Sequence, residues 1–144
     1  MTEEIRILLV DDEKLVLRSM EKTLLRAGFD VETALDAGAG LDLFARARET
    51  GLPFALAILD LQMPDASGAE NPDAGMELLS ELLAVQPDLP VVVLSAFDDV
   101  SRAKEAVVRG ARAYLVKGRE AGLVEMVNEI VEKEYSNGRQ RQAG

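Results

Sequence analysis

Two segments decide the fold of this chain: IRILLV at residues 5–10, followed by Asp11 and Asp12, and LAIL at residues 56–59, followed by Asp60. Both are short and almost continuously apolar. Such runs are typical of parallel strands that are covered by helices on both faces, because neither face of the strand meets water. Three further runs follow the same plan: the weaker run at residues 29–34, and the runs at 91–94 and 113–116. The sequence therefore predicts five strands.

Stretches with helical periodicity fill the gaps between these runs, beginning at about residues 14, 36, 76, 98 and 123. Asp36 is a suitable N-cap, and Gly28 and Gly110 are natural helix stops. The last stretch has the clearest period, with apolar residues at i, i+3, i+4, i+7 and i+8: Leu123, Met126, Val127, Ile130 and Val131. Strands that alternate with helices in this way predict right-handed crossovers and one doubly wound, parallel α/β sheet.

The length, net charge and missing residue types of the chain exclude several classes of function. The chain has 144 residues, enough for one domain, and its net charge of −10 opposes binding to nucleic acid or to anionic lipid. It contains no Cys and no His, which excludes disulfides, thiolate chemistry, histidine-ligated zinc and Ser-His hydrolysis. No apolar run is long enough for a signal peptide or a membrane span. We expect a soluble, cytoplasmic protein that binds neither nucleic acid nor membrane.

Polar residues follow directly after four of the five predicted strands: Asp11 and Asp12, Asp60, Ser95 and Lys117. The carboxyl ends of neighbouring parallel strands meet at one edge of an open α/β sheet, where ligands bind. Any single aspartate among them is also a candidate helix cap, and for Asp12 that alternative is a serious one. The coincidence at four strand ends favours a functional site.

The chemistry of this set is that of a hard oxygen site. Carboxylates about 4 Å apart repel each other by roughly 4 kcal/mol at an effective dielectric near 20, so they need a cation among them. Mg²⁺ prefers such oxygen ligands. A carboxylate can also attack phosphorus and form an aspartyl phosphate, a reaction that needs positioning, a metal, a further cation and a hydroxyl.

With these motifs the chain resembles the receiver domains of two-component response regulators over residues 5–133. The resemblance rests on the acidic pair after strand one, on Asp60 with Met63-Pro64 after it, on Ser95-Ala96 and on Lys117. It implies a flavodoxin-like (βα)5 domain with strand order 2-1-3-4-5. We expect the remaining segment, 134–144, to be a frayed tail.

The resemblance also implies a role for each motif residue. Asp60 would be the phosphoacceptor, and Mg²⁺ would be held by Asp11, Asp12, Asp60 and the backbone carbonyl of Gln62. Lys117 and Ser95 would stabilise the phosphoryl group, and the small Ala96 would leave room for it to enter. Ser95 and Tyr114 would form the switch, although Tyr114 is also explained as an ordinary amphipathic strand residue.

Two features depart from the family pattern. Residues 65–74 (DASGAENPDA) lengthen the loop between strand three and the next helix, and their composition predicts an exposed loop. Tolerated length variation is favoured there over a lid or a partner contact. Gly118 stands after Lys117, where the family has Pro. We expect a trans Lys117–Gly118 peptide, an unusual backbone conformation at Gly118, and a lysine that is loosely held in the resting state.

The sequence thus predicts a phosphorylation-controlled switch, with no enzymatic activity beyond its own phosphorylation and dephosphorylation. Its partners would be a histidine kinase or phosphotransfer protein and a downstream protein, which contacts the face formed by helix four, strand five and helix five. We expect a monomer or weak dimer. Three alternatives stay open: a receiver fragment of a longer regulator or hybrid kinase, a Mg²⁺-dependent phosphohydrolase with an aspartyl nucleophile, and a degenerate receiver that only scaffolds.

Overall fold

The computed structural model describes residues 5–64, 67, 70–71, 73–96, 99–118 and 120–143. Strands and helices alternate along the chain as the sequence predicts. In chain order the elements are β1 (Arg6–Val10), α1 (Lys14–Arg26), β2 (Asp30–Ala34), α2 (Ala37–Glu49), β3 (Leu56–Asp60), β4 (Met63–Pro64), β5 (Glu70–Asn71), α3 (Ala74–Val85), β6 (Val91–Ser95), α4 (Val100–Val108), β7 (Ala113–Val116), the 3₁₀ turn η1 (Glu120–Gly122) and α5 (Leu123–Ala143).

Five strands form one parallel sheet in the order β2-β1-β3-β6-β7. Counted along the main sheet alone, this is the order 2-1-3-4-5, so the predicted flavodoxin-like topology is confirmed. The strand order reverses between β1 and β3, and the carboxyl ends of these two strands bound the crevice where doubly wound sheets bind ligands.

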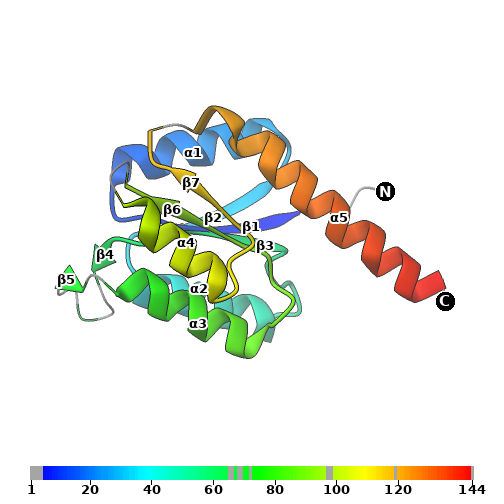
Figure 1. Ribbon diagram of the computed structural model, residues 1–144. Coiled ribbons are helices and arrows are strands. Elements are labelled where there is room, and N and C mark those ends of the chain that lie inside the picture. The colour runs from blue at the N-terminus through cyan, green and yellow to red at the C-terminus, as the bar shows by residue number, and fades with distance from the viewer. Residues whose placement is uncertain are drawn as a thin grey trace.

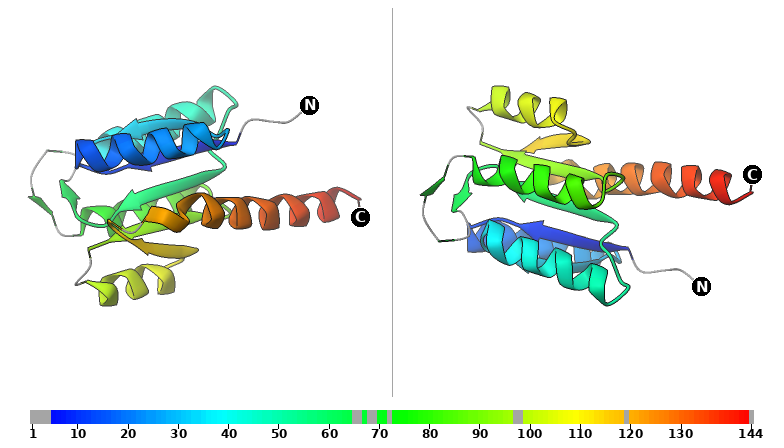
Figure 2. Two further views of the ribbon diagram at one scale, coloured as in Figure 1. Left: turned by 90° about the horizontal axis from the view of Figure 1, so that it is seen from above. Right: turned by 90° about the horizontal axis from the view of Figure 1, so that it is seen from below.

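Helices cover both faces of the sheet (Figures 1 and 2). On one face, α1 and α5 bury Leu24 and Val127 against the sheet. On the other face, α2, α3 and α4 bury Phe44, Leu79 and Ala106. Because both faces are covered, the residues of β3 and β6 are buried throughout, which explains their continuous apolar runs.

The helix boundaries follow the signals in the sequence. Asp36 caps α2 by accepting a hydrogen bond of 2.7 Å from the backbone N–H of Ala39. Gly28 and Gly110 follow α1 and α4 with φ of +97° and +121°, as the predicted helix stops require. Asp99 is the N-cap residue of α4, and its side chain makes no cap hydrogen bond.

The described residues at the two ends of the long segment after β3 include two short paired strands. Part of it forms a small antiparallel hairpin, in which Met63 pairs with Asn71 and residue 64 with residue 70. Met63 is buried in the core on the α2–α3 face, so the hairpin is anchored to the domain. Strands of two residues carry no periodic pattern, which is why an exposed loop was predicted instead.

The backbone of α5 is helical to Ala143, and among the residues whose side chains the structure describes, Val131 is the last that packs against the core. In Figure 2 its C-terminal end projects past the sheet on the side away from the β4–β5 hairpin. The segment is expected to fray because beyond Tyr135 it has no core-forming residue except Ala143, yet Arg, Gln and Ala have good helix propensity. Fraying of this end stays a prediction. No helix in the described part of the chain is both long enough and apolar enough to span a bilayer.

Candidate functional site

The carboxyl edge of the sheet collects the buried polar side chains of the domain. Among the described residues, three polar or charged side chains are buried: Asp11, Asp60 and Ser95, with exposed fractions of 0%, 1% and 2%. They follow or end β1, β3 and β6, which are neighbours in the sheet. Buried polar groups are costly unless they are paired, so their concentration at one edge indicates a site.

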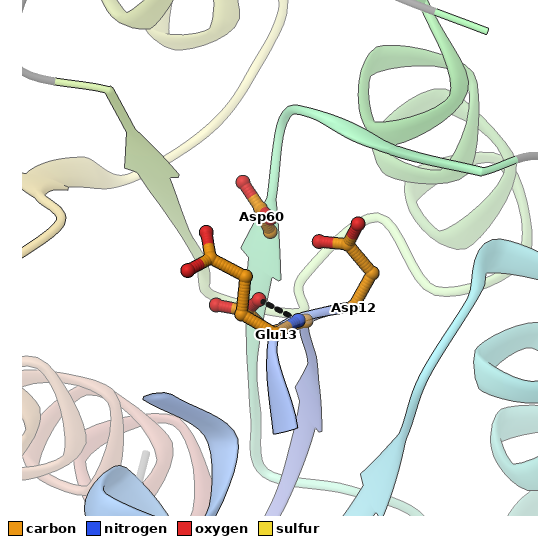
Figure 3. A group of neighbouring side chains, drawn as sticks. Asp12, Glu13 and Asp60 are labelled. Atoms are coloured by element: carbon orange, nitrogen blue, oxygen red, sulfur yellow. Dashed lines mark hydrogen bonds between the residues drawn. The ribbon is translucent and has the colours of Figure 1, made fainter. Parts of the chain in front are cut away.

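Four carboxylates gather at this edge. Asp11, Asp12, Glu13 and Asp60 each present an oxygen atom, and these atoms lie within 4.8 Å of one another. Figure 3 shows Asp12, Glu13 and Asp60 together where β1 and β3 end. The N-cap of α1 is Glu13 and has no side-chain cap bond, so helix capping does not account for Asp12. We did not predict Glu13 as a site residue; its place directly after the acidic pair, at the start of α1, was the available signal.

Lys117 provides the positive charge of the site. Its Nζ donates to Asp11 Oδ1 at 3.2 Å and to Asp60 Oδ2 at 3.0 Å, and it also bonds the Glu13 carboxylate. Its backbone N–H donates to the Ser95 carbonyl at 2.9 Å, which ties the end of β7 to the end of β6. The expectation of a loosely held resting lysine is therefore wrong, because the carboxylates attract the ammonium group without any phosphoryl group present.

The peptide after Lys117 has the predicted conformation. The peptide bond between Lys117 and Gly118 is trans. Gly118 adopts φ of +87°, in a region of backbone conformation that residues other than glycine rarely adopt. The glycine thus lets the chain turn away directly after β7. Lys117 meanwhile stays at the carboxyl edge of the sheet with Asp11, Glu13 and Asp60, a group of residues here called the rim.

Burial and mutual repulsion shift the ionisation of the rim. Burial and, after it, the charge of Asp11 raise the pKa of Asp60 to about 7, although the charge and hydrogen bond of Lys117 oppose the shift. Burial also raises the pKa of Asp11, against the hydrogen bond from the Glu13 backbone and the charge of Lys117. For Lys117, burial alone would lower the pKa, but the bond to Glu13 and the charge of Asp60 raise it above its ordinary value.

The donor set fits a divalent cation. Within the described structure, Asp11 Oδ2 is buried and has no hydrogen-bond partner, whereas Oδ1 accepts from both Lys117 and the Glu13 N–H. An unpartnered buried carboxylate oxygen beside the exposed carboxylate of Asp12 is what a hard, oxygen-seeking cation such as Mg²⁺ requires. Gln62 donates its N–H to Asp60 Oδ1 at 3.1 Å, and its carbonyl as a metal ligand stays a prediction.

The remaining predicted residues lie close to the site but are not turned toward Asp60. Ser95 Oγ donates to the Asp99 carbonyl at 2.8 Å and lies 3.2 Å from the Ala96 carbonyl. Ala96 is half-buried directly after β6, and Tyr114 is half-buried on β7, against the core on the α2–α3 face. The structure thus brings Asp11, Asp12, Asp60 and Lys117 together, whereas the Ser95 hydroxyl bonds the backbone before α4 and Tyr114 packs against the core.

Helix α3 begins in close contact with the backbone of Asp60. A Cβ atom at Gly75 would lie 2.5 Å from the Asp60 carbonyl oxygen and 2.6 Å from Leu61 Cα, both backbone atoms that cannot move aside cheaply. Glycine at this position therefore allows the α3 terminus to approach β3, and this close approach fixes where the strand end and its carboxylate lie.

Comparison with known proteins agrees with this geometry. The family model described as the response regulator receiver domain matches residues 7–128. The chain is 35% identical over 123 residues to the two-component response regulator ARR18 of Arabidopsis thaliana, covering 85% of this chain and 17% of that protein. It is also 35% identical over 113 residues to the response regulator MprA of a Mycobacterium species, covering 78% and 44%. The chain thus spans less than half the length of these curated relatives.

Solved structures show the same fold. The receiver domain protein (CheY-like) of Methanospirillum hungatei superposes with a TM-score of 0.76 at 27% identity, over 94% of this chain and 99% of that one. A receiver domain from Clostridium thermocellum gives a TM-score of 0.77 at 27% identity, over 91% and 97%.

The raised pKa of Asp60 predicts a pH-dependent stability. Between about pH 4 and 7 the folded protein holds a proton on Asp60 that the unfolded chain releases, so the free energy of unfolding falls as pH rises through this window. Urea unfolding at a series of pH values in a chelating buffer should show this fall. In Asp60→Asn, the fall in the free energy of unfolding across this pH window should be smaller than in the wild-type protein by more than about 1 kcal/mol.

Asp42→Asn on the exposed surface of α2 is the control for net charge, and it should keep the slope of the wild-type protein. Parallel curves for the wild-type protein and Asp60→Asn would show that burial does not shift the pKa of Asp60.

Proposed function

The chain belongs to the response regulator receiver domain family, and we propose that it is a phosphorylation-controlled switch whose phosphoacceptor is Asp60. The observation that carries the proposal is the placement of Asp60. Its carboxylate is buried at the topological switch point, held by Lys117 on one oxygen and by the Gln62 N–H on the other, beside the acidic cluster. This arrangement orients a carboxylate nucleophile and keeps a cation next to the oxygen where negative charge must be stabilised.

The proposed reaction is attack of an Asp60 carboxylate oxygen on the phosphorus atom of a phosphohistidine. A P–O bond to Asp60 forms while the P–N bond to the histidine breaks, and the imidazole leaves with the bonding electrons. Lys117 stays in contact with Asp60 throughout and neutralises part of the charge of the transferred group. Mg²⁺, when bound by Asp11, Asp12 and Asp60, would neutralise further charge on the phosphoryl oxygens.

The donor follows from the family. A receiver domain implies a cognate histidine kinase, and we propose that the phosphoryl group reaches Asp60 from such a kinase or from a phosphotransfer protein. Receiver domains are typically switches rather than enzymes, so catalysis would be limited to the chain's own phosphorylation and dephosphorylation. The curated relatives are much longer than this chain. The proposed switch is therefore compatible with a free-standing receiver and with a receiver that is one domain of a larger regulator.

The proposed switch runs from Ser95 to Tyr114. In this structure the Ser95 hydroxyl donates to the Asp99 carbonyl at the start of α4. A phosphoryl group on Asp60 offers that hydroxyl a charged acceptor, and hydrogen bonds to charged groups are the stronger ones. Loss of the bond to Asp99 would release the loop before α4 and let Tyr114 move inward, which changes the surface formed by α4, β7 and α5.

Phosphorylation should be confined to Asp60. Incubation with acetyl phosphate and Mg²⁺ should add one phosphoryl group to the intact protein, measured by mass spectrometry, and Asp60→Asn should abolish the addition. Asp36→Asn, which removes one carboxylate charge at the α2 N-cap but keeps a side-chain oxygen to accept the cap bond, is the control and should still gain the group. Addition of one phosphoryl group to Asp60→Asn at the wild-type rate would refute the assignment.

The switch should be visible in backbone amide spectra. Fluoroberyllate, a mimic of the phosphoryl group, should shift amides at 95–96, across α4 and around Tyr114. Ser95→Ala has no hydroxyl to transfer, so in that variant the shifts should stay near Asp60 and not reach Tyr114. If the wild-type protein changes only at the rim, the α4–β7–α5 surface is not the responding one.

A further inference from the structure

A groove lies on the face of the domain that carries α2 and α3, beside the β4–β5 hairpin. Its volume is about 360 Å³. Ala37 and Leu41 of α2 and Leu78 of α3 form its apolar floor, and Asn71 of the hairpin is part of one wall. None of these residues belongs to the phosphoacceptor site, so the groove requires its own explanation.

Asn71, which lines the groove, belongs to the lengthened segment after β3. Asn71 pairs with the buried Met63 across the hairpin, and its side-chain Oδ1 accepts a hydrogen bond of 2.9 Å from the Asp73 N–H just before α3. The wall is therefore held at both of its ends, by the core through Met63 and by the start of α3 through Asp73. The departure of this chain from the family pattern thus creates a concave surface between α2 and α3.

The edge of the groove is acidic. Glu77 and Glu81 line it from α3, one helical turn apart, and both are exposed. Over the ranges that the structure describes, neither carboxylate has an ion-pair partner. Like charges at i and i+4 on a helix destabilise it, and a cation placed between them removes that repulsion. An apolar floor with an acidic edge complements an aliphatic side chain flanked by lysine or arginine.

We propose that this groove is a docking site for a basic amphipathic segment of a protein partner. An aliphatic side chain of the partner packs on the half-buried Ala37 and Leu41, and its neighbouring cationic side chain pairs with Glu77 and Glu81. The acidic edge disfavours the phosphates of nucleic acid and of anionic lipid, and the net charge of −10 of the whole chain disfavours a second copy as the occupant. The proposal does not depend on phosphorylation of Asp60.

A short synthetic peptide of leucine and lysine is a suitable probe, titrated into ¹⁵N-labelled full-length protein. The amide shifts should concentrate at 37–41, at Asn71 and at 74–81. The double variant Glu77→Gln/Glu81→Gln should weaken the binding of the peptide about fivefold, since it removes two exposed ion pairs.

The matched control is Glu125→Gln/Glu129→Gln. It removes two exposed glutamates with the same i, i+4 spacing from α5, so it changes the net charge by the same amount. The control variant should bind the peptide as the wild-type protein does, and a peptide with glutamate in place of lysine should not shift the groove. Three results would each overturn the proposal: equal weakening in both double variants, shifts spread over other acidic surfaces, or no binding of the lysine peptide. Thermal unfolding of both variants confirms that neither result comes from a damaged fold.

Discussion

The ion-pair network of Lys117 with Asp60 and Asp11 is the interaction on which the site depends. Two fully buried carboxylates next to each other would repel strongly in a low-dielectric environment, and each loses most of its hydration. One ammonium group cannot neutralise both of them together with Glu13. Burial and, after it, the charge of Asp11 raise the pKa of Asp60, and Asp11 keeps a buried oxygen without a partner in the described structure. The rim is thus stable enough to form and still short of positive charge, which is the condition for binding a cation and a phosphoryl group.

The fold keeps this unfavourable arrangement in place. Asp11, Asp60 and Lys117 sit at the ends of strands whose backbones are fixed by the parallel sheet and by helices on both faces. Gly75 lets α3 begin against the Asp60 backbone, so the end of β3 is packed directly against the start of that helix. The apolar packing of the whole domain therefore offsets the unfavourable free energy of burying these carboxylates next to one another.

Most of the fold and of the acidic site could be predicted from the sequence, because the signals for each strand and helix are local and the parallel topology then determines which strand ends meet. Apolar runs and helix stops located the elements, and the shared direction of the strands brought Asp11, Asp12, Asp60 and Lys117 to one edge. What it could not predict depended on side-chain geometry. The hairpin after β3 has strands too short for a periodic pattern, the bond from Ser95 to the Asp99 carbonyl depends on one rotamer, and the resting position of Lys117 depends on a charge balance that includes Glu13. The same limits hid the groove beside α3.

Calorimetric titration with Mg²⁺ tests the central claim most directly, namely that the rim is short of positive charge and that its carboxylates act together on a cation. The wild-type protein should bind one Mg²⁺ per chain, and Asp12→Asn should weaken the affinity at least tenfold, about 1.4 kcal/mol. Asp42→Asn, which removes an exposed carboxylate on α2, should leave the affinity unchanged. An affinity for Asp12→Asn equal to that of the wild-type protein would place the cation elsewhere and contradict the account.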